Sequence, residues 1–235
     1  MSTYAFTDVH GQYGLWDMIK NHCKEDDTIY FLGDACDRGP DSIKIIKELL
    51  NDPRVIYLKG NHEELLETIV PELFEGGVNN FTHWLNNGGG ETWEELSRER
   101  DSVIQGIIYQ IKKLPYTATY KNTKGQHIFL SHSGAYRPFP LGRYHKWNII
   151  PDEDLYLWDR THIKETEWDY RFPKVYVVHG HTPVQLYFKS ELPYSYCENH
   201  KIDLDLASFD TKKIALLDLD TFEYHIFEDT PFENN

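Results

Sequence analysis

The chain of 235 residues has little cysteine, no long apolar run and no excess of basic residues. Its three cysteines, Cys23, Cys36 and Cys197, are too few and too scattered for a disulfide framework or a cysteine-based zinc site. The first residues, MSTYAFTDVHG, do not have the basic and apolar regions of a signal peptide. No segment approaches the roughly 18 consecutive apolar residues of a membrane-spanning helix. We therefore expect a cytoplasmic protein with no membrane partner.

The charge balance argues against a nucleic-acid partner. The formal net charge is −14, from 24 Lys and Arg against 38 Asp and Glu. Because nucleic-acid binding usually depends on a basic face, such a surface would repel a long phosphate backbone. A small phosphorylated molecule is not excluded, since metal ions bound in a site can reverse the sign of the local field.

The pattern of apolar residues predicts a single α/β domain over residues 1–235. The first 65 residues alternate short β-rich runs with helical patterns, which indicates βαβ units and a mostly parallel sheet. Asp41 is a candidate cap for one of these helices. The second half is richer in strands, so we expect two packed mixed β-sheets flanked by helices, with a helical insertion at about 76–115. The expected strands are 4–7, 29–32, 55–58, 127–131, 175–179, 201–206, 214–219 and 223–227, and the expected helices are 15–24, 42–50 and 63–73.

Five of the expected strands end in side chains that bind metals or exchange protons. Ligands of open α/β sheets bind beyond the carboxyl ends of the strands, so we expect these side chains to meet at one edge. Asp and His suit Mn, Zn or Fe, and a carboxylate can bridge two ions. The strand ends carry Asp8 and His10, the run GDACDRG from Gly33 to Gly39, the run GNHE from Gly60 to Glu63, His132, and Gly180-His181-Thr182.

A charge count supports a site for two metal ions. Two divalent cations contribute four positive charges, whereas Asp8, Asp34 and a bridging hydroxide contribute three negative ones. The net positive centre would attract a phosphate ester, as in hydrolytic sites whose two ions lie about 3.5–4 Å apart. Glycines at 33, 60 and 180 are expected to let the backbone turn sharply beside such a site.

The ordered series DVHG, GDACDRG, GNHE, an isolated His and GHT resembles the signature of the calcineurin-like metallophosphoesterases. Within them it is most similar to the phosphoprotein phosphatase branch, especially bacterial and bacteriophage Ser/Thr phosphatases of the lambda type. The resemblance runs from Asp8 to about Ala207. It implies a four-layer α/β/β/α sandwich and direct attack by a bridging hydroxide. A departure at Thr7, where the branch usually has Gly, is expected to affect backbone packing rather than ligation.

The resemblance also implies roles for individual residues. His62 would be the general acid, oriented by Asp37, and Arg38 and Arg160 would bind the phosphate. The cofactors would be two divalent ions, with Mn²⁺ the first expectation and Fe or Zn also compatible. The first metal would be held by Asp8, His10 and Asp34, and the second by Asp34, Asn61, His132 and His181.

Two functions remain open at this point, and a third is disfavoured. The first is hydrolysis of phosphomonoesters, with a phosphorylated protein or a small phosphoester as substrate, by a Ser/Thr protein phosphatase. The alternative is a symmetric dinucleoside tetraphosphate hydrolase, which often has a small residue where this chain has Asp37. A non-catalytic scaffold is disfavoured because all six expected ligand positions are filled. The sequence leaves open the physiological substrate, the native metal and the oligomeric state.

Several neighbouring residues have simpler interpretations. Glu63 is expected to support the start of a helix, and Cys36 to be a small buried residue. Trp84 and Trp93 are expected to pack, and residues 87–90 to shape a substrate rim. The acidic run 91–99 is typical of a solvated helix face.

Overall fold

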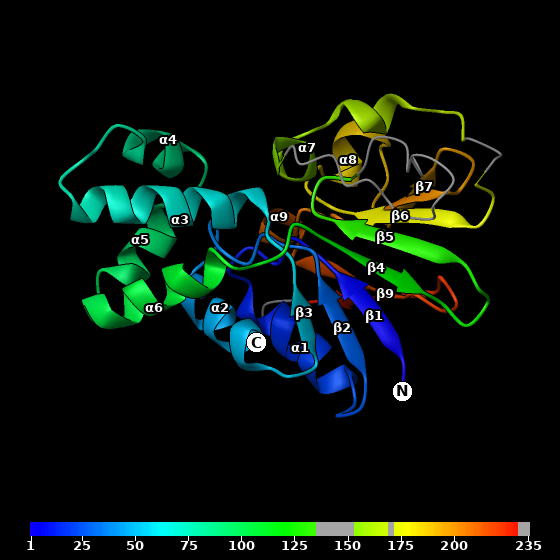
Figure 1. The fold of residues 1–235 in the computed structure, drawn as a ribbon, viewed down its shortest axis with the longest axis horizontal. Coiled ribbons are helices and arrows are strands. Elements are labelled where there is room, and N and C mark those ends of the chain that lie inside the picture. The colour runs from blue at the N-terminus through cyan, green and yellow to red at the C-terminus, as the bar shows by residue number, and fades with distance from the viewer. Residues whose placement is uncertain (135–152, 169–171, 230–235) are drawn as a thin grey trace, which may run out of the picture.

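Two five-stranded mixed sheets form the centre of the computed structural model (Figure 1), which describes residues 1–134, 153–168 and 172–229. The strand order of the first sheet is β10-β9-β1-β2-β3. Strands β1, β2 and β3 are parallel, β9 runs antiparallel to β1, and β10 runs antiparallel to β9. Its strands are β1 (Thr3–Phe6), β2 (Thr28–Phe31), β3 (Val55–Tyr57), β9 (Lys213–Asp218) and β10 (Tyr224–Glu228).

The second sheet has the order β4-β5-β6-β8-β7, with β5, β6 and β8 parallel and an antiparallel strand at each edge. Its strands are β4 (Thr117–Lys121), β5 (His127–Ser131), β6 (Val175–His179), β7 (Tyr194–Tyr196) and β8 (Lys201–Asp203). The predicted architecture of two mixed sheets flanked by helices is confirmed.

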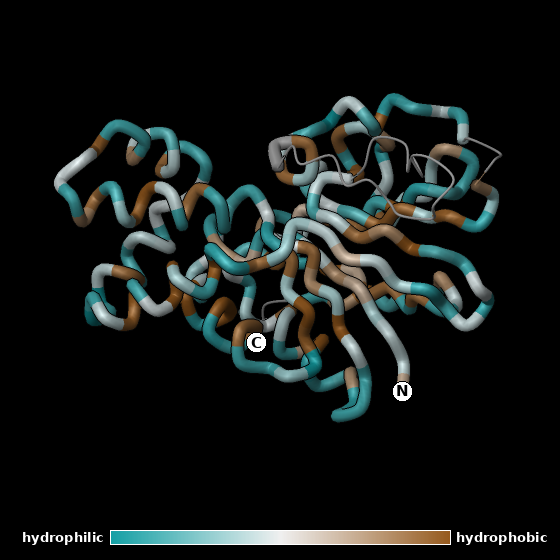
Figure 2. The backbone as a smooth tube through the Cα atoms, viewed as in Figure 1, coloured by the Kyte–Doolittle hydropathy of each residue, from teal (hydrophilic) through white to brown (hydrophobic). Residues whose placement is uncertain are grey.

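Alternation of side chains along the strands produces the layers. Ala5 pairs with Tyr30, and both face the second sheet in a cluster with residues such as Leu130. Their neighbours Phe6 and Phe31 point the other way, into a larger cluster with the helices. Because successive side chains of a strand point to opposite faces, one short apolar run supplies both cores. Figure 2 shows these hydrophobic stretches along the strands and hydrophilic turns at the periphery.

Helices α1 and α2 cover the outer face of the first sheet, and α3 to α6 form a helical segment beside it (Figure 1). The short helices α7 and α8 lie beside the second sheet (Figure 1). Within the described residues, no helix combines the length and apolar character needed to cross a bilayer. The helices are α1 (Tyr13–His22), α2 (Ser42–Asn51), α3 (Asn61–Phe74), α4 (Phe81–Asn86), α5 (Gly90–Leu96), α6 (Asp101–Ile111), α7 (Glu153–Leu157), the 3-10 helix η1 (Thr161–Lys164), α8 (Val184–Tyr187) and α9 (Ser208–Thr211).

The structure corrects two local predictions. Asp41 precedes α2 but makes no capping bond with its side chain. The first amides of α2, those of Ser42 and Ile43, donate instead to the carboxylate of Glu95 from α5, at 2.6 and 3.1 Å. The acidic run 91–99 is therefore not only a solvated face, since one of its members caps a distant helix.

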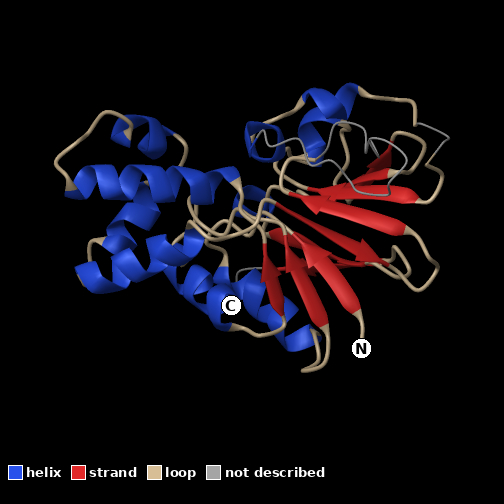
Figure 3. Cartoon of the chain, viewed as in Figure 1, coloured by secondary structure: helices blue, strands red, loops and turns tan. Residues whose placement is uncertain are grey.

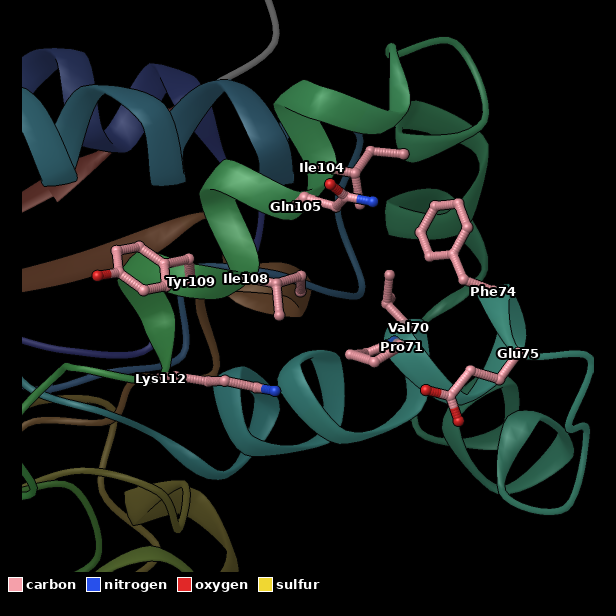
Figure 4. Close-up of a pocket in the computed structure, with 9 residues that line it drawn as sticks. All are labelled: Val70, Pro71, Phe74, Glu75, Ile104, Gln105, Ile108, Tyr109 and Lys112. Atoms are coloured by element: carbon pink, nitrogen blue, oxygen red, sulfur yellow. The ribbon is translucent and has the colours of Figure 1, made fainter.

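An apolar groove of about 300 Å³ opens between α3 and α6 (Figure 4). It is lined by Val70 and Phe74 at the end of α3 and by Ile104, Ile108 and Tyr109 of α6. None of the residues expected in the metal site lines it, so the groove is separate from the site described next.

Candidate metal centre and active site

All six expected ligands come together at the ends of the strands. Figure 3 shows the loops that meet at this edge of the sheets. The loops that carry them follow β1, β2, β3, β5 and β6, so parallel strands of both sheets direct their carboxyl ends to the same place. Every one of the six side chains is buried. They are Asp8, His10, Asp34, Asn61, His132 and His181.

Asp34 is the central residue of this cluster. Its Oδ2 lies 3.4 Å from Nε2 of His132, 3.6 Å from Nε2 of His10 and 3.8 Å from Nε2 of His62. Two groups of potential ligands share it, one with His10 and His62 and one with His132 and His181. Its other oxygen, Oδ1, accepts the amide of His62 at 3.0 Å, which fixes the carboxylate. This arrangement fits a bridging ligand between two cations.

Asp8, unlike Asp34, belongs to neither of these two groups of potential ligands. Its Oδ1 lies 3.8 Å from Nε2 of His10, but Oδ2 already accepts the amide of His181 at 3.0 Å and the hydroxyl of Thr7 at 2.6 Å. Thr7 therefore contacts the carboxylate itself, whereas the sequence suggested an effect on the backbone alone. Ser208 from α9 also donates to the backbone carbonyl of Asp8.

Hydrogen bonds to backbone carbonyls set the imidazole orientation. His10 Nδ1 lies 2.8 Å from the carbonyl of Cys36, and His132 Nδ1 lies 2.9 Å from that of Leu32. A carbonyl can only accept, so Nδ1 carries the proton and Nε2 faces the site. The Nε2 atom of His181 is buried with no partner among the described residues. This donor set fits divalent cations such as Mn²⁺, Zn²⁺ or Fe²⁺.

The charges in the cluster also suit a cation. Burial alone would raise the pKa of Asp34, but the imidazoles of His132 and His62 outweigh it and hold that pKa well below the usual value. Burial raises the pKa of Asp8; His132 opposes this shift, and repulsion from Asp34 adds to it. A bound cation would relieve the repulsion between these two buried carboxylates.

The backbone of the site is strained at six residues. Asp8, His10, Asp34, Asp37, Arg38 and His181 all have φ between +44° and +72°. This left-handed region is uncommon for residues other than glycine, although Asp and His tolerate it better than most. Such residues gather at functional sites because the surrounding structure must hold them there.

The glycines expected to form sharp turns have two different roles. Gly33 has φ of +99° and does form such a turn. Gly60 and Gly180 instead allow close approach. A Cβ atom on Gly60 would lie 2.2 Å from Oδ1 of Asp34, and one on Gly180 would lie 2.1 Å from Oδ2 of Asp8. Any side chain at these two positions would displace an acidic residue of the site.

His62 and Asp37 form a buried pair beside the cluster. Nδ1 of His62 lies 2.7 Å from Oδ2 of Asp37, which leaves Nε2 facing the site. Burial lowers the pKa of His62, but the attraction of Asp34 and Asp37 outweighs it, so the net pKa is raised. The guanidinium of Arg38 lies 2.8 Å from Nε2 of His10 and 2.9 Å from Nε2 of His62, within reach of anything bound between them.

Two further residues complete the edge of the site. Arg160 donates from Nε to the hydroxyl of Thr182 at 3.2 Å. The pKa of His181 is held well below its usual value by burial first, then by the charge of His132, and then by the charge of Arg160. Arg160 therefore lies beside the second group of potential ligands. Phe209, which the sequence did not suggest, lies under the guanidinium of Arg38 at 4.8 Å and packs edge-on against His10.

Glu63 has a larger role than support of a helix start. Its buried carboxylate accepts the amides of Asp34 at 2.8 Å, Ala35 at 2.7 Å and Gly60 at 2.8 Å, together with the hydroxyl of Tyr57 at 2.8 Å. One side chain thus ties the loops after β2 and β3 together. The bond to Gly60 is half of a capping box, in which a Glu three residues after the N-cap accepts the N-cap amide. This spacing is the sequence signal for the role of Glu63.

The sequence matches the model of the calcineurin-like phosphoesterases over residues 1–207. The chain therefore belongs to this family. Together with the two groups of potential His and Asp ligands, this makes it a metal-dependent phosphoesterase, a hydrolase of phosphoric ester bonds.

Individual relatives divide between two named activities. Serine/threonine-protein phosphatase 1 of Salmonella typhimurium is 25% identical over 159 residues, covering 66% of this chain and 67% of that protein. The asymmetrical bis(5′-nucleosyl)-tetraphosphatase PrpE of Bacillus subtilis is 30% identical over 209 residues, covering 79% and 80%. Among solved structures, a protein serine/threonine phosphatase from Saccharomyces cerevisiae has a TM-score of 0.62 at 13% identity, covering 100% of this chain and 82% of that one. The last likeness concerns the fold alone.

Proposed function

We propose that this protein hydrolyses phosphomonoesters and that its substrate class is phosphorylated serine or threonine in a protein. The observation that carries the proposal is the contact of 2.7 Å between His62 Nδ1 and Asp37 Oδ2, with Nε2 of His62 directed at the site. This geometry suits a general acid, because one ring nitrogen is fixed by a carboxylate while the other can hold a proton for the leaving group.

The leaving group distinguishes the candidate substrates. Serine and threonine depart as alkoxides, which are strong bases and need a proton as the bond to phosphorus breaks. A nucleotide departs from a polyphosphate as a stable anion and needs no such help. A buried His–Asp pair therefore contributes most to alkyl phosphomonoesters, where general acid catalysis is worth about 10²–10⁴-fold.

The remaining side chains would bind and orient the phosphate. Arg38 would donate to the phosphoryl oxygens from its position between His10 and His62, and Arg160 would approach from the side of His181. Guanidinium groups suit this task because they form paired hydrogen bonds to phosphate. Two bound divalent cations, for which we propose Mn²⁺, would supply Lewis acidity and an activated water. The proposed ligands are Asp8, His10, Asp34, Asn61, His132 and His181.

A second candidate is hydrolysis of dinucleoside tetraphosphates. The similarity to PrpE supports it, since 30% identity extends over 79% of this chain. The proposed metal ligands and both arginines would serve either reaction, and among the side chains of the site only the His62–Asp37 pair favours the phosphomonoester.

An activity matrix on protein stripped with a chelator tests the proposal. The substrates are a phosphoserine peptide, p-nitrophenyl phosphate and diadenosine tetraphosphate, each with Mn²⁺, Fe²⁺, Zn²⁺ or Mg²⁺. We expect turnover of both phosphomonoesters, highest with Mn²⁺ and absent without metal. A strong preference for the dinucleotide would reverse the order of the two candidates.

A further inference from the structure

The carboxylate of Asp37 is fully buried and receives three hydrogen bonds. His62 contacts its Oδ2, and the indole Nε1 of Trp84 donates to the same oxygen at 2.9 Å. The hydroxyl of Thr92 donates to Oδ1 at 2.7 Å and accepts the amide of Asp37 at 2.9 Å. Trp84 and Thr92 are themselves fully buried. Trp84 therefore does more than pack.

We infer that Trp84 and Thr92 are positioning residues that fix the Asp37–His62 pair, so that helices α4 and α5 take part in catalysis. The inference rests on the proposed function, because it concerns the proton that His62 would give to the leaving oxygen. The carboxyl torsion of an Asp side chain is soft, so an unsupported carboxylate can turn away. Donors on both oxygens prevent this, and Nε2 of His62 then stays directed at the site.

Helices α4 and α5 are joined at two places to the segment that runs from β2 to the start of α2 and carries Asp37. The amide of Arg38 donates to the carbonyl of Gly88 at 2.8 Å. Gly88 has φ of +96°, and a Cβ atom there would lie 2.5 Å from Cγ of Arg38, so only glycine lets this turn approach so closely. On the other side, Glu95 holds the first amides of α2. Gly88 thus supports the loop between β2 and α2, whatever residues 87–90 contribute to a substrate rim.

A purely structural role for Trp84 and Thr92 makes a different prediction. Loss of folded protein or of metal would lower the rate for every substrate by the same factor. Loss of a positioned acid would slow an alkyl phosphate far more than p-nitrophenyl phosphate, because p-nitrophenolate leaves without protonation.

The test removes one donor at a time. Trp84→Phe keeps a ring but loses the N–H, and Thr92→Val keeps the shape but loses the hydroxyl. Trp93→Phe is the matched control, since Trp93 also lies on α5 and packs edge-on against Phe81 but, within the described residues, makes no hydrogen bond to Asp37. We expect kcat for a phosphoserine peptide to fall about tenfold in each of the first two variants, and kcat for p-nitrophenyl phosphate to change less than about twofold. Thr92→Ser should restore the rate.

A second readout needs no substrate. The proton on Nδ1 of His62 should give an NMR resonance protected from solvent exchange in the wild type and in Trp93→Phe, and a broadened one in Trp84→Phe and Thr92→Val. Equal rate losses on both substrates, or an unchanged resonance in both variants, would overturn the inference. If the wild type did not turn over phosphoserine but the resonance responded as expected, the proposed function would fail and the positioning role would stand.

Discussion

Replacement of Glu63 by Gln should cost the fold about 3 kcal/mol. The carboxylate accepts three backbone amides and the hydroxyl of Tyr57, and hydrogen bonds to a charged group contribute about 1.5–3 kcal/mol each. Summed over the three amides, the loss would be about 4.5–9 kcal/mol. Two effects reduce it. Glutamine keeps one acceptor oxygen. The change also removes a buried negative charge that the site disfavours, since burial and repulsion from Asp34 raise the pKa of Glu63.

Glutamine cannot satisfy the whole set whichever way its amide turns. Oε1 accepts Ala35 and Tyr57, and Oε2 accepts Asp34 and Gly60. An NH₂ group at either position therefore faces at least one backbone N–H. A buried amide left without an acceptor costs about 1–3 kcal/mol, and this cost accounts for most of the expected net loss.

Urea unfolding at pH 7 with a chelator present measures the loss without a contribution from metal binding. The control is Glu94→Gln, because the Glu94 side chain is 73% exposed and its ion pair with Arg98 is at the surface. That variant should stay within about 0.5 kcal/mol of the wild type. A loss below about 1 kcal/mol for Glu63→Gln, with the dependence on urea unchanged, would refute the reasoning.

Three further predictions test the site and its support. Asp34→Asn removes the shared carboxylate, so metal affinity measured by calorimetry should fall at least about 100-fold and turnover should be lost; a wild-type rate would contradict the bridging role. If His62 is the acid rather than a ligand beside His10 and Asp34, His62→Asn should keep its metal, measured by elemental analysis, but slow alkyl phosphates about 10²–10⁴-fold and p-nitrophenyl phosphate much less. Burial raises the pKa of Glu95 from 4.5 to about 6, so the folded protein binds this proton more tightly than the unfolded chain. The resulting stability is present below pH 4.5 and lost as the pH rises through 6. The free energy of unfolding of the wild type relative to Glu95→Gln should therefore fall between pH 4.5 and 7, and a constant difference would contradict the raised pKa of Glu95.

The apolar pattern located central strands better than edge strands. The predicted ranges 127–131 and 175–179 coincide with β5 and β6, whose apolar runs lie between two cores. The edge strand β4 was missed because its residues are only partly buried and include Thr and Lys, and β7 was missed because it has only three residues. The predicted strand 201–206 ends early, at Asp203, where the side chain accepts the amide of Asp205 and turns the chain.

The gathering of the expected ligands could be predicted because each lies in a short motif at a strand end, where local order and sheet topology together determine its position. The supporting contacts join residues far apart in the chain. Trp84 and Asp37 are 47 residues apart, Glu95 and Ser42 are 53 apart, and Ser208 and Asp8 are 200 apart. Periodicity and motif spacing describe neighbours along the chain, so they do not reveal pairs of this kind.

The strained backbone explains why such distant contacts are needed. A residue held in the left-handed region costs about 1–3 kcal/mol, and six residues of the site adopt it. The strands alone do not fix these loops. The contacts that do are the carboxylate of Glu63, the hydroxyl of Ser208, and amide–carbonyl bonds between the loops after β1 and β2, such as His10 to Asp34 at 3.0 Å. These contacts hold the loops that carry the expected ligands. A change that weakens them should therefore lower metal affinity together with stability, even where no ligand is altered.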